Sequence, residues 1–297
     1  MTVTFTPAQQ AEMLQCFGKP FMDALPARLA DYAKRWGLAK FSFIEYYSVN
    51  CLFLCRSEKH GSCVLKIFGC DYAWYIGEFR MLCELNGKCG YVGVYEHDEE
   101  GGALLLERIE PGITLKLEPS LERRTAIFAD IWQSARIVPR DPSLYKTYLE
   151  TAEDITKKLT RSDRTPELQR AALRMESICK DLYGQYSERV LLHADLHGDN
   201  LLKDAYGGYR IVDPHARIGP PICDLGRYIA NEYEDAEHEN RAAVTEAVIT
   251  QLASALHLPQ ADIARAFFVD ITLMTCWSAE HGAVDLGGAL YAESLLG

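Results

Sequence analysis

The stretch LLHADLHGDNLL, at positions 191–202, decides the fold, and RIVDPH at positions 210–215 completes it. Asp195 and Asn200 lie in a loop between short apolar runs, and Asp213 ends the next run. The glycine-containing turn at 204–208 joins the last two runs as a hairpin. Two carboxylates and an amide at the ends of adjoining strands can converge on one point, where such oxygen ligands suit Mg²⁺. A carboxylate there can also receive the proton of an attacking hydroxyl.

The spacing of these residues matches the catalytic loop of protein kinases, H-R-D-x-x-x-x-N. His193 stands two positions before Asp195, and Asn200 five positions after it. Asp213 then takes the place of the Mg²⁺-binding aspartate on the following strand. A lone H-x-D would be weak, but the complete series, with a hairpin between its halves, predicts phosphoryl transfer with Asp195 as base and Asn200 and Asp213 as metal ligands.

The N-terminal third contains residues that match a nucleotide site. Lys66 lies within the apolar run VLKIF at 64–68, comparable to the lysine of the kinase V-A-I-K strand, and is predicted to bind the α- and β-phosphates. An ordinary strand-edge lysine is the alternative. Glu78, or less well Glu84, is placed to pair with it. The run LLLERI at 104–109, followed by Pro-Gly, has the form of a hinge, so backbone groups of Glu107 and Ile109 are expected to bind adenine.

The rest of the pattern predicts an α+β, two-lobed fold. An antiparallel sheet with one main helix is expected in lobe 1–109, with strands at 41–56 (bent near 48–50), 62–68, 90–95 and 103–109 and a helix at 71–85. A mostly helical lobe is expected at 110–297, with helices at 119–138, 142–159, 166–189, 241–257 and 260–278. The segment 190–231, which holds the catalytic stretch, does not read as helix.

Composition narrows the function classes. The 297 residues carry 31 Lys and Arg against 42 Asp and Glu, a net charge of -11, which argues against a nucleic-acid partner and is compatible with a cationic substrate. No membrane span or signal peptide is visible, so a cytoplasmic location is expected. Six of the ten cysteines fall between Cys51 and Cys89 without a C-x2-C pair, and they are expected to be reduced, buried apolar side chains.

The sequence resembles the aminoglycoside phosphotransferases of the kinase-like superfamily, and more closely the aminoglycoside/hydroxyurea kinase group, which includes streptomycin 6-phosphotransferases. LHADLHGDN at 192–200, IVDPHARIGPP at 211–221 and, less sharply, CWS at 276–278 carry the resemblance. It implies a kinase-like fold with ATP in the interlobe cleft. YYSVN at 46–50 stands where protein kinases have a glycine-rich loop. Aminoglycoside kinases often have a Ser- or Asn-bearing loop there, so Ser48 and Asn50 are expected at the nucleotide.

The resemblance implies an ATP- and Mg²⁺-dependent kinase for a hydroxyl of a small molecule, most of all a streptomycin-type aminoglycoside. No activation loop or A-P-E segment is found, which favours a small-molecule acceptor. A metabolic kinase for hydroxyurea, an amino sugar, a choline-like alcohol or homoserine is the alternative within the same chemistry. A nucleotide-binding protein without transfer activity is the alternative outside it.

Several polar residues have both a functional and a structural interpretation. The acidic run 231–239 is either a solvated face or, through Glu232, Glu234 and Asp235, a site for a polycationic acceptor. His215 is expected near the acceptor or as a structural loop residue. His193 and His197 are four apart, but a loop containing Gly198 does not hold a helical zinc pair, and His193 is expected to brace the loop. Asp199 and Asp224 are interpreted as structural carboxylates, Asp224 as a helix cap or a support of the catalytic loop.

Overall fold

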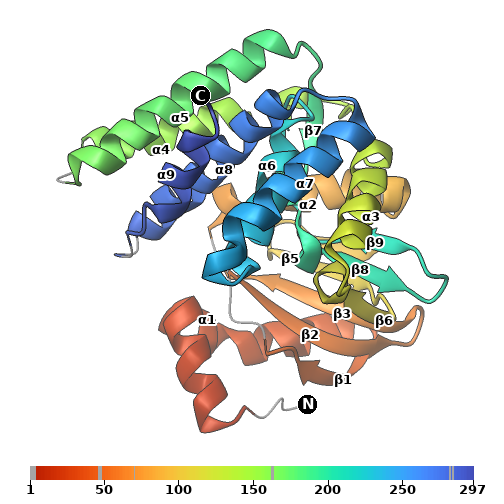
Figure 1. Cartoon of the computed structure of the whole chain (residues 1–297). Coiled ribbons are helices and arrows are strands. Elements are labelled where there is room, and N and C mark those ends of the chain that lie inside the picture. The colour runs from red at the N-terminus through yellow and green to blue at the C-terminus, as the bar shows by residue number, and fades with distance from the viewer. Residues whose placement is uncertain (1–4, 46–48, 70, 162–163, 281, 283) are drawn as a thin grey trace. The chain divides into compact units, whose positions relative to one another are not determined.

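The computed structural model describes residues 5–45, 49–69, 71–161, 164–280, 282 and 284–297 (Figure 1). The chain divides into two compact units. One comprises Met1–Gly112 with Asp204–Tyr206, and the other comprises Ile113–Lys203 with Gly207–Gly297. None of the helices in these described ranges is long and apolar enough to span a bilayer.

The first unit is built on an antiparallel sheet of the strand order β1-β2-β3-β5-β4. Its strands are β1 (Leu38–Phe43), β2 (Asn50–Ser57), β3 (Gly61–Phe68), β4 (Val94–Asp98) and β5 (Ala103–Glu107). Two α-helices, α1 (Pro7–Trp36) and α2 (Tyr72–Leu85), and a short 3-10 helix (Lys88–Gly90) accompany it. The predicted antiparallel sheet is therefore confirmed.

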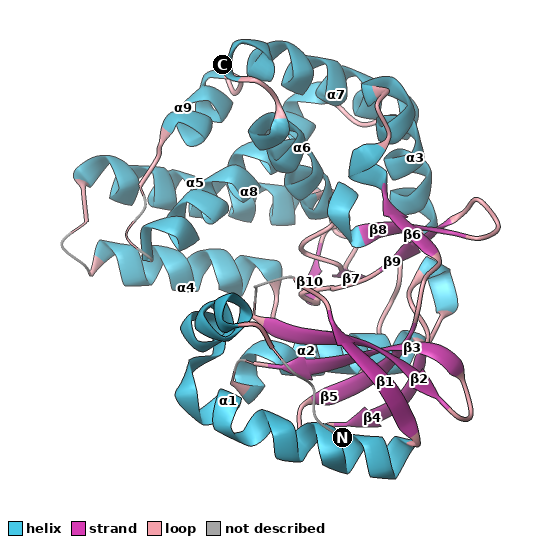
Figure 2. Ribbon diagram, turned by 90° about the horizontal axis from the view of Figure 1, so that it is seen from below, coloured by secondary structure: helices cyan, strands magenta, loops and turns pink. Residues whose placement is uncertain are grey.

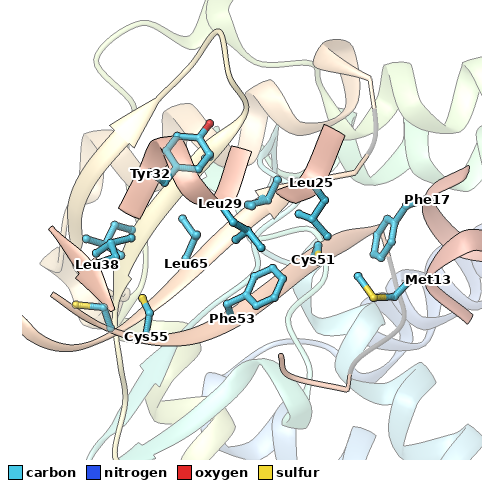
Figure 3. Close-up of a cluster of buried hydrophobic side chains, with 14 residues drawn as sticks. Met13, Phe17, Leu25, Leu29, Tyr32, Leu38, Cys51, Phe53, Cys55 and Leu65 are labelled. Carbon is cyan, nitrogen blue, oxygen red and sulfur yellow. The ribbon is translucent and has the colours of Figure 1, made fainter. Parts of the chain in front are cut away.

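Helix α1 covers one face of this sheet. Because successive side chains of a strand point to opposite faces, Cys51 and Phe53 of β2 and Leu65 of β3 share the face that packs on α1. The core there also takes Met13, Phe17, Leu25, Leu29 and Tyr32 from the helix (Figure 3). Each fully buried side chain of this size contributes roughly 1.5–3 kcal/mol by leaving water. The alternation leaves Lys66 and Phe68 on the opposite face, where Phe68 stacks on Tyr75 of α2.

No helix was expected at α1, although the local sequence contains its start and stop signals. Thr6 and Gln9 form a capping box ahead of Pro7, and Gly37 ends the helix in the left-handed conformation. Non-helical φ/ψ angles at Gly18 and internal prolines interrupt the element, which obscures its apolar periodicity. Its stability therefore comes from packing on the sheet.

The second unit is mostly helical, as predicted. Helix α8 lies at its centre and packs against α6, α5 and α9, while α4 packs on α5 and α3 on α7 (Figure 2). The helices are α3 (Leu121–Ser134), α4 (Tyr148–Thr160), α5 (Pro166–Gln185), α6 (Cys223–Asp235), α7 (Arg241–Leu256), α8 (Gln260–Glu280) and α9 (Gly287–Ser294). The short strands are β6 (Pro111–Thr114), β7 (Val190–Leu192), β8 (Leu201–Asp204), β9 (Tyr209–Ile211) and β10 (Arg217–Gly219).

Several expected boundaries were wrong. Helices α3 and α5 end about one turn earlier than expected, and α9 was not expected. Three further differences have a local physical reason. Helix α6 begins at Cys223, inside the segment 190–231 that was expected to be non-helical, because tight packing on α8 outweighs the unfavourable Pro-Pro and glycine signals. Helix α4 begins at Tyr148, not at Pro142, since Thr147 and Glu150 form a capping box and Pro142 starts only a 3-10 turn. Strand β4 lies at 94–98, later than the expected 90–95, where it pairs with β5.

Gly226 allows α6 and α8 to approach closely, which yields a stability prediction. A Cβ at this position would lie 2.2 Å from the carbonyl oxygen of Ala266 and 2.9 Å from the Cβ of Asp270. We expect Gly226→Ala to lower the free energy of unfolding by about 3 kcal/mol, because neither neighbour is the flexible end of a side chain. Urea unfolding measures the change.

Gly184→Ala is the matched control for Gly226→Ala. Gly184 lies in α5 with no atom within 4 Å of an added Cβ, so alanine should leave stability unchanged or raise it by up to about 1 kcal/mol. Equal stabilities of the two variants would contradict the close packing of α6 on α8.

Candidate active site

Backbone hydrogen bonds hold the two predicted catalytic stretches together. Strand β7 pairs with β10, and β8 with β9, so the loop 193–200 and the segment 212–216 join neighbouring strands. The N–H of Val212 donates to the carbonyl of Asn200 (3.0 Å), and the N–H of His215 donates to the carbonyl of His193 (2.7 Å). The backbone that carries Asp213 is thereby fixed beside Asn200, as the sequence pattern predicted for adjoining strand ends.

Asp195 is a partly buried carboxylate, 15% exposed, surrounded by nitrogen atoms. Its Oδ1 lies 3.2 Å from Nη1 of Arg227, while its Oδ2 lies 3.6 Å from Nε2 of His197 and 3.7 Å from Nε2 of His215. Burial disfavours the charged form, but His215, His197 and Arg227 outweigh it and hold the pKa of Asp195 well below its usual range. Asp195 is therefore ionised at neutral pH, as a proton acceptor must be.

Asn200 is oriented by the residue that precedes it by five positions. Its Nδ2 donates to the carbonyl oxygen of Asp195 (2.8 Å) and lies 3.3 Å from Oδ2 of the same residue. The amide nitrogen is thus directed into the loop, which leaves the amide oxygen on the other side. An amide oxygen with the Asp213 carboxylate is a donor set that fits Mg²⁺, which takes few protein ligands and completes its shell with phosphate and water oxygens.

Hydrogen bonds that involve His193 and Asp224 stabilise the loop 193–200. The backbone N–H groups of His193 and Ala194 donate to the two carboxylate oxygens of Asp224, at 3.0 and 2.7 Å. Ala194 has a φ of 61°, a left-handed conformation that these bonds hold in place. Burial raises the pKa of Asp224 to about 7 although both N–H groups oppose it, and burial lowers the pKa of His193 to about 4. The structural interpretations of both residues fit these contacts.

The histidines do not form a zinc pair. Nε2 of His193 lies 2.8 Å from the carbonyl of Val212, and Nε2 of His197 lies 3.2 Å from Nδ2 of Asn200. Across the described part of the chain, no three His, Cys, Asp or Glu side chains are grouped as metal ligands. His215 lies beside Asp195 with 44% of its side chain exposed.

In the first unit, Lys66 and Glu78 form the predicted ion pair and both are buried. Asn50, the first residue of β2, is buried beside them: with its amide oxygen turned toward Lys66 it accepts a hydrogen bond from Nζ at 3.2 Å. Nζ also lies 5.4 Å from the centre of the Phe68 ring. A cation held by one carboxylate in a buried setting can exchange part of that contact for phosphate oxygens. Ser48 lies outside the described residues.

The two predicted hinge residues, Glu107 and Ile109, lie at the end of β5 and just beyond it. The N–H of Glu107 donates to the carbonyl of Gly93 (2.8 Å), and its carboxylate accepts from the N–H of Gly93 (3.2 Å). The N–H of Glu107 is thus already used within the sheet, so its carbonyl is the group to consider for adenine. Ile109, beyond the end of β5, is buried.

The acidic run is largely neutralised by cations of the same chain. Glu232 is buried and receives hydrogen bonds from Nε and Nη2 of Arg124 (2.6–2.9 Å). Lys116 lies 2.8 Å from Asp235, and Arg241 lies 3.8 Å from Glu234. The solvated-face interpretation therefore fails for Glu232, and this carboxylate is occupied by an internal partner.

Two charged residues near Asp195 had no predicted role. Arg227 of α6 contacts Asp195 and, through Nε, lies 2.7 Å from Oδ1 of the fully buried Asp270 in α8. The available signal was Asp270 itself, a single carboxylate within the apolar run AFFVDITLM at 266–274. A buried charge requires a partner, but the sequence does not say which of many arginines supplies it.

The cysteines are mostly the buried apolar side chains that were expected. Cys51, Cys55, Cys63, Cys179, Cys223 and Cys276 are buried, whereas Cys16 and Cys89 are exposed, and these described thiols are free. Burial raises the pKa of Cys51 and of Cys55 to about 12, so neither is a reactive thiolate.

Sequence comparison identifies the family. The family described as aminoglycoside/hydroxyurea antibiotic resistance kinase matches residues 77–282, more than two thirds of the chain. This protein belongs to that family. It is thus a small-molecule kinase, and the predicted enzyme class is confirmed.

Two curated relatives are similar to this chain. A streptomycin 6-kinase of Streptomyces griseus is 28% identical over 201 residues, which is 66% of this chain and 64% of the relative. A hydroxyurea phosphotransferase of Kitasatospora aureofaciens is 26% identical over 288 residues, which is 94% of this chain and 81% of the relative. The chain thus spans a little under two thirds of the first relative and four fifths of the second.

Solved structures share the fold. An ethanolamine kinase of Plasmodium vivax has a TM-score of 0.66 at 13% identity, covering 100% of this chain and 94% of the other. The choline kinase LicA of Streptococcus pneumoniae has a TM-score of 0.63 at 17% identity, covering 92% and 99%. An aminoglycoside phosphotransferase, APH(4)-Ia, in complex with ADP and hygromycin B, has a TM-score of 0.62 at 15% identity, covering 90% and 95%. The predicted kinase-like fold is confirmed.

Proposed function

We propose that this kinase uses ATP with Mg²⁺ to phosphorylate a hydroxyl group of a streptomycin-type aminoglycoside. The observation that carries the proposal is Asp195, a partly buried carboxylate with a lowered pKa. Asn200, five positions later in the loop, donates a hydrogen bond to its backbone carbonyl. A carboxylate that stays ionised can accept the proton of a hydroxyl as that hydroxyl attacks phosphorus. Phosphoryl transfer otherwise depends on positioning and charge neutralisation.

Each remaining site residue has a proposed part in this reaction. Lys66, oriented by Glu78 and Asn50, binds the α- and β-phosphates, and the carbonyl of Glu107 and the backbone of Ile109 bind adenine. Asn200 and Asp213 hold Mg²⁺. The metal would neutralise phosphate charge when bound. Ser48 stays a candidate from the sequence alone. Because the reaction consumes ATP, we propose the cytoplasm as its location.

The acceptor is proposed from charge and relatedness. The net charge of -11 favours a polycation, and the streptomycin 6-kinase is one of the two curated relatives. Glu234 and Asp235 are exposed and are held only by ion pairs that a cationic acceptor could replace. Glu232 is left out because Arg124 occupies it. His215, half-exposed at 3.7 Å from Asp195, is proposed to face the acceptor hydroxyl.

A panel of acceptors tests this proposal. ADP release is measured with streptomycin, hygromycin B, hydroxyurea, choline and homoserine, and each product is examined by phosphorus NMR. We expect the highest kcat/KM with streptomycin and a phosphate monoester as product. Turnover of hydroxyurea alone would favour the second candidate function, a hydroxyurea kinase. The similarity to the hydroxyurea phosphotransferase, which covers 94% of this chain, supports that candidate. ATP binding without turnover of any acceptor would show a nucleotide-binding protein instead.

A further inference from the structure

Arg227 lies between two carboxylates in the interior of the second unit. Its Nη1 is 3.2 Å from Oδ1 of Asp195, and its Nε is 2.7 Å from Oδ1 of Asp270. Arg227 is 7% exposed and Asp270 is fully buried. Tyr148 completes the chain of contacts, because its hydroxyl donates to Oδ2 of Asp270 at 2.6 Å. A continuous polar path therefore runs from α4 through α8 and α6 to the catalytic loop.

This arrangement is costly for a purely structural ion pair. Within the described residues, Nε and Nη2 of Arg227 and Oδ1 of Asp270 are buried without a hydrogen bond of good geometry, although the charges are in contact. Buried polar atoms left in this state destabilise a fold by about 1–3 kcal/mol each. Packed apolar side chains would often be at least as stable as such a pair. A pair that is costly to stability points to a role beyond stability, and Asp195 is the residue that the arginine reaches.

The two oxygens of Asp195 have different surroundings. Oδ1 faces the Arg227 guanidinium, whereas Oδ2 faces His197, His215 and the amide of Asn200. A guanidinium that contacts one oxygen restricts rotation of the carboxylate. The second oxygen, on the side of the Asn200 amide, is then the one presented to a substrate.

We infer that Arg227 is a positioning residue for Asp195: it holds Oδ1 and thereby aims Oδ2 at the acceptor hydroxyl, while Asp270 and Tyr148 hold the guanidinium. The inference rests on the proposed role of Asp195 as base. In the step itself, the O–H bond of the acceptor breaks, its proton goes to Oδ2, and the oxygen forms a bond to the γ-phosphorus as ADP leaves. Arg227 touches none of the reacting atoms and acts through Asp195 alone.

The charge-balanced variant Arg227→Met with Asp270→Asn tests this inference. It removes one positive and one negative charge together, and the amide that replaces the Asp270 carboxylate would still accept a hydrogen bond from Tyr148. Asp195 loses the guanidinium but keeps its contacts with His197, His215 and Asn200. We expect the variant to fold, with kcat about 10²-fold lower, since misplacement of a reacting group by about 1 Å has this effect. The KM for ATP should change less than about twofold. A kcat within about threefold of wild type would overturn the inference and make Arg227 a structural partner of Asp270 only.

Arg265→Met with Asp262→Asn is the matched control. It removes another arginine–carboxylate pair of α8, at 3.5 Å, in which Asp262 is also buried. Because the Arg265 side chain is 37% exposed, its loss of stability should be modest, with kcat unchanged. If kcat falls equally in both double variants, the effect is structural and the inference is wrong.

Arg227→Lys decides the question if the charge-balanced variant does not fold. One ammonium cannot span both carboxylates as the guanidinium does, so kcat should be about tenfold lower at nearly the same melting temperature. Wild-type kcat in this variant would overturn the inference. Failure of the proposed function is a different result: wild-type enzyme itself would then turn over no acceptor.

Discussion

Asp195→Asn is expected to lower kcat for phosphoryl transfer about 10³-fold, within the range that positioned general bases contribute. The amide preserves the size and shape of the side chain but cannot accept the hydroxyl proton. It also loses the charge that faces Arg227, His197 and His215. ATP affinity should change less than about threefold, because Lys66, Glu78 and Asn50 lie in the other unit of the chain. Transfer is measured by ADP release under saturating ATP and acceptor, and affinity by calorimetry.

Asp199→Asn is the control for this result. Asp199 lies in the same loop, but its side chain is 43% exposed and paired with Lys116 at 3.3 Å. Its neutralisation should leave kcat within about threefold, as expected for a surface ion pair. Should Asp195→Asn retain a tenth of wild-type kcat, the base would have to be another group, and should Asp199→Asn match its loss, the general charge of the loop would be responsible.

The geometry of the loop 193–200 could be predicted because its contacts are local. Asp195 and Asn200 are five positions apart, and the loop between two short strands determines their distance. The Lys66–Glu78 pair spans only 12 positions, from a strand to the next helix, and could be predicted for the same reason. In both cases the periodicity of a strand or the spacing of a loop fixes the geometry before the rest of the chain is known.

Partners that are distant in the sequence could not be predicted. The acidic run was considered as a site for a cationic acceptor, yet Arg124, 108 positions away, already binds Glu232. Arg227 and Asp270 lie on different helices, and only the packing of α6 against α8 brings them into contact. A carboxylate within an apolar stretch of sequence shows that a cationic partner is needed. Which cation supplies it depends on the tertiary structure.

Helix α6 illustrates the same limit for secondary structure. Pro220, Pro221 and Gly226 are unfavourable signals for a helix from 223 onward, but Gly226 is the residue that lets α6 approach the backbone of α8. The feature that weakened the local prediction is therefore what the packing requires. Asp224 and Arg227, both on this helix, depend on that packing for their positions beside the catalytic loop.

Lys66→Met is expected to lower kcat/KM for ATP about 10²–10³-fold, the usual effect of removing one charged donor from a phosphate site. It should also lower the free energy of unfolding by about 3–5 kcal/mol, because Glu78 would stay buried without its cation. The two effects have different causes and can be separated. ATP titrations of the rate give the first, and urea unfolding gives the second.

The double variant Lys66→Met with Glu78→Leu separates the effect on ATP use from the effect on stability. Removing both charges leaves one apolar side chain on β3 and one on α2. Stability should then return to within about 1 kcal/mol of wild type, since well-packed apolar residues replace buried ion pairs at little cost. Nucleotide use should stay as low as in the single variant, because no cation meets the phosphates. Lys59→Met, in the turn between β2 and β3 and at an exposed ion pair with Glu96, controls for loss of a lysine next to this sheet and should change neither quantity. If the double variant regained ATP use along with stability, Lys66 would be a structural lysine, and the phosphates would have to be bound by another residue.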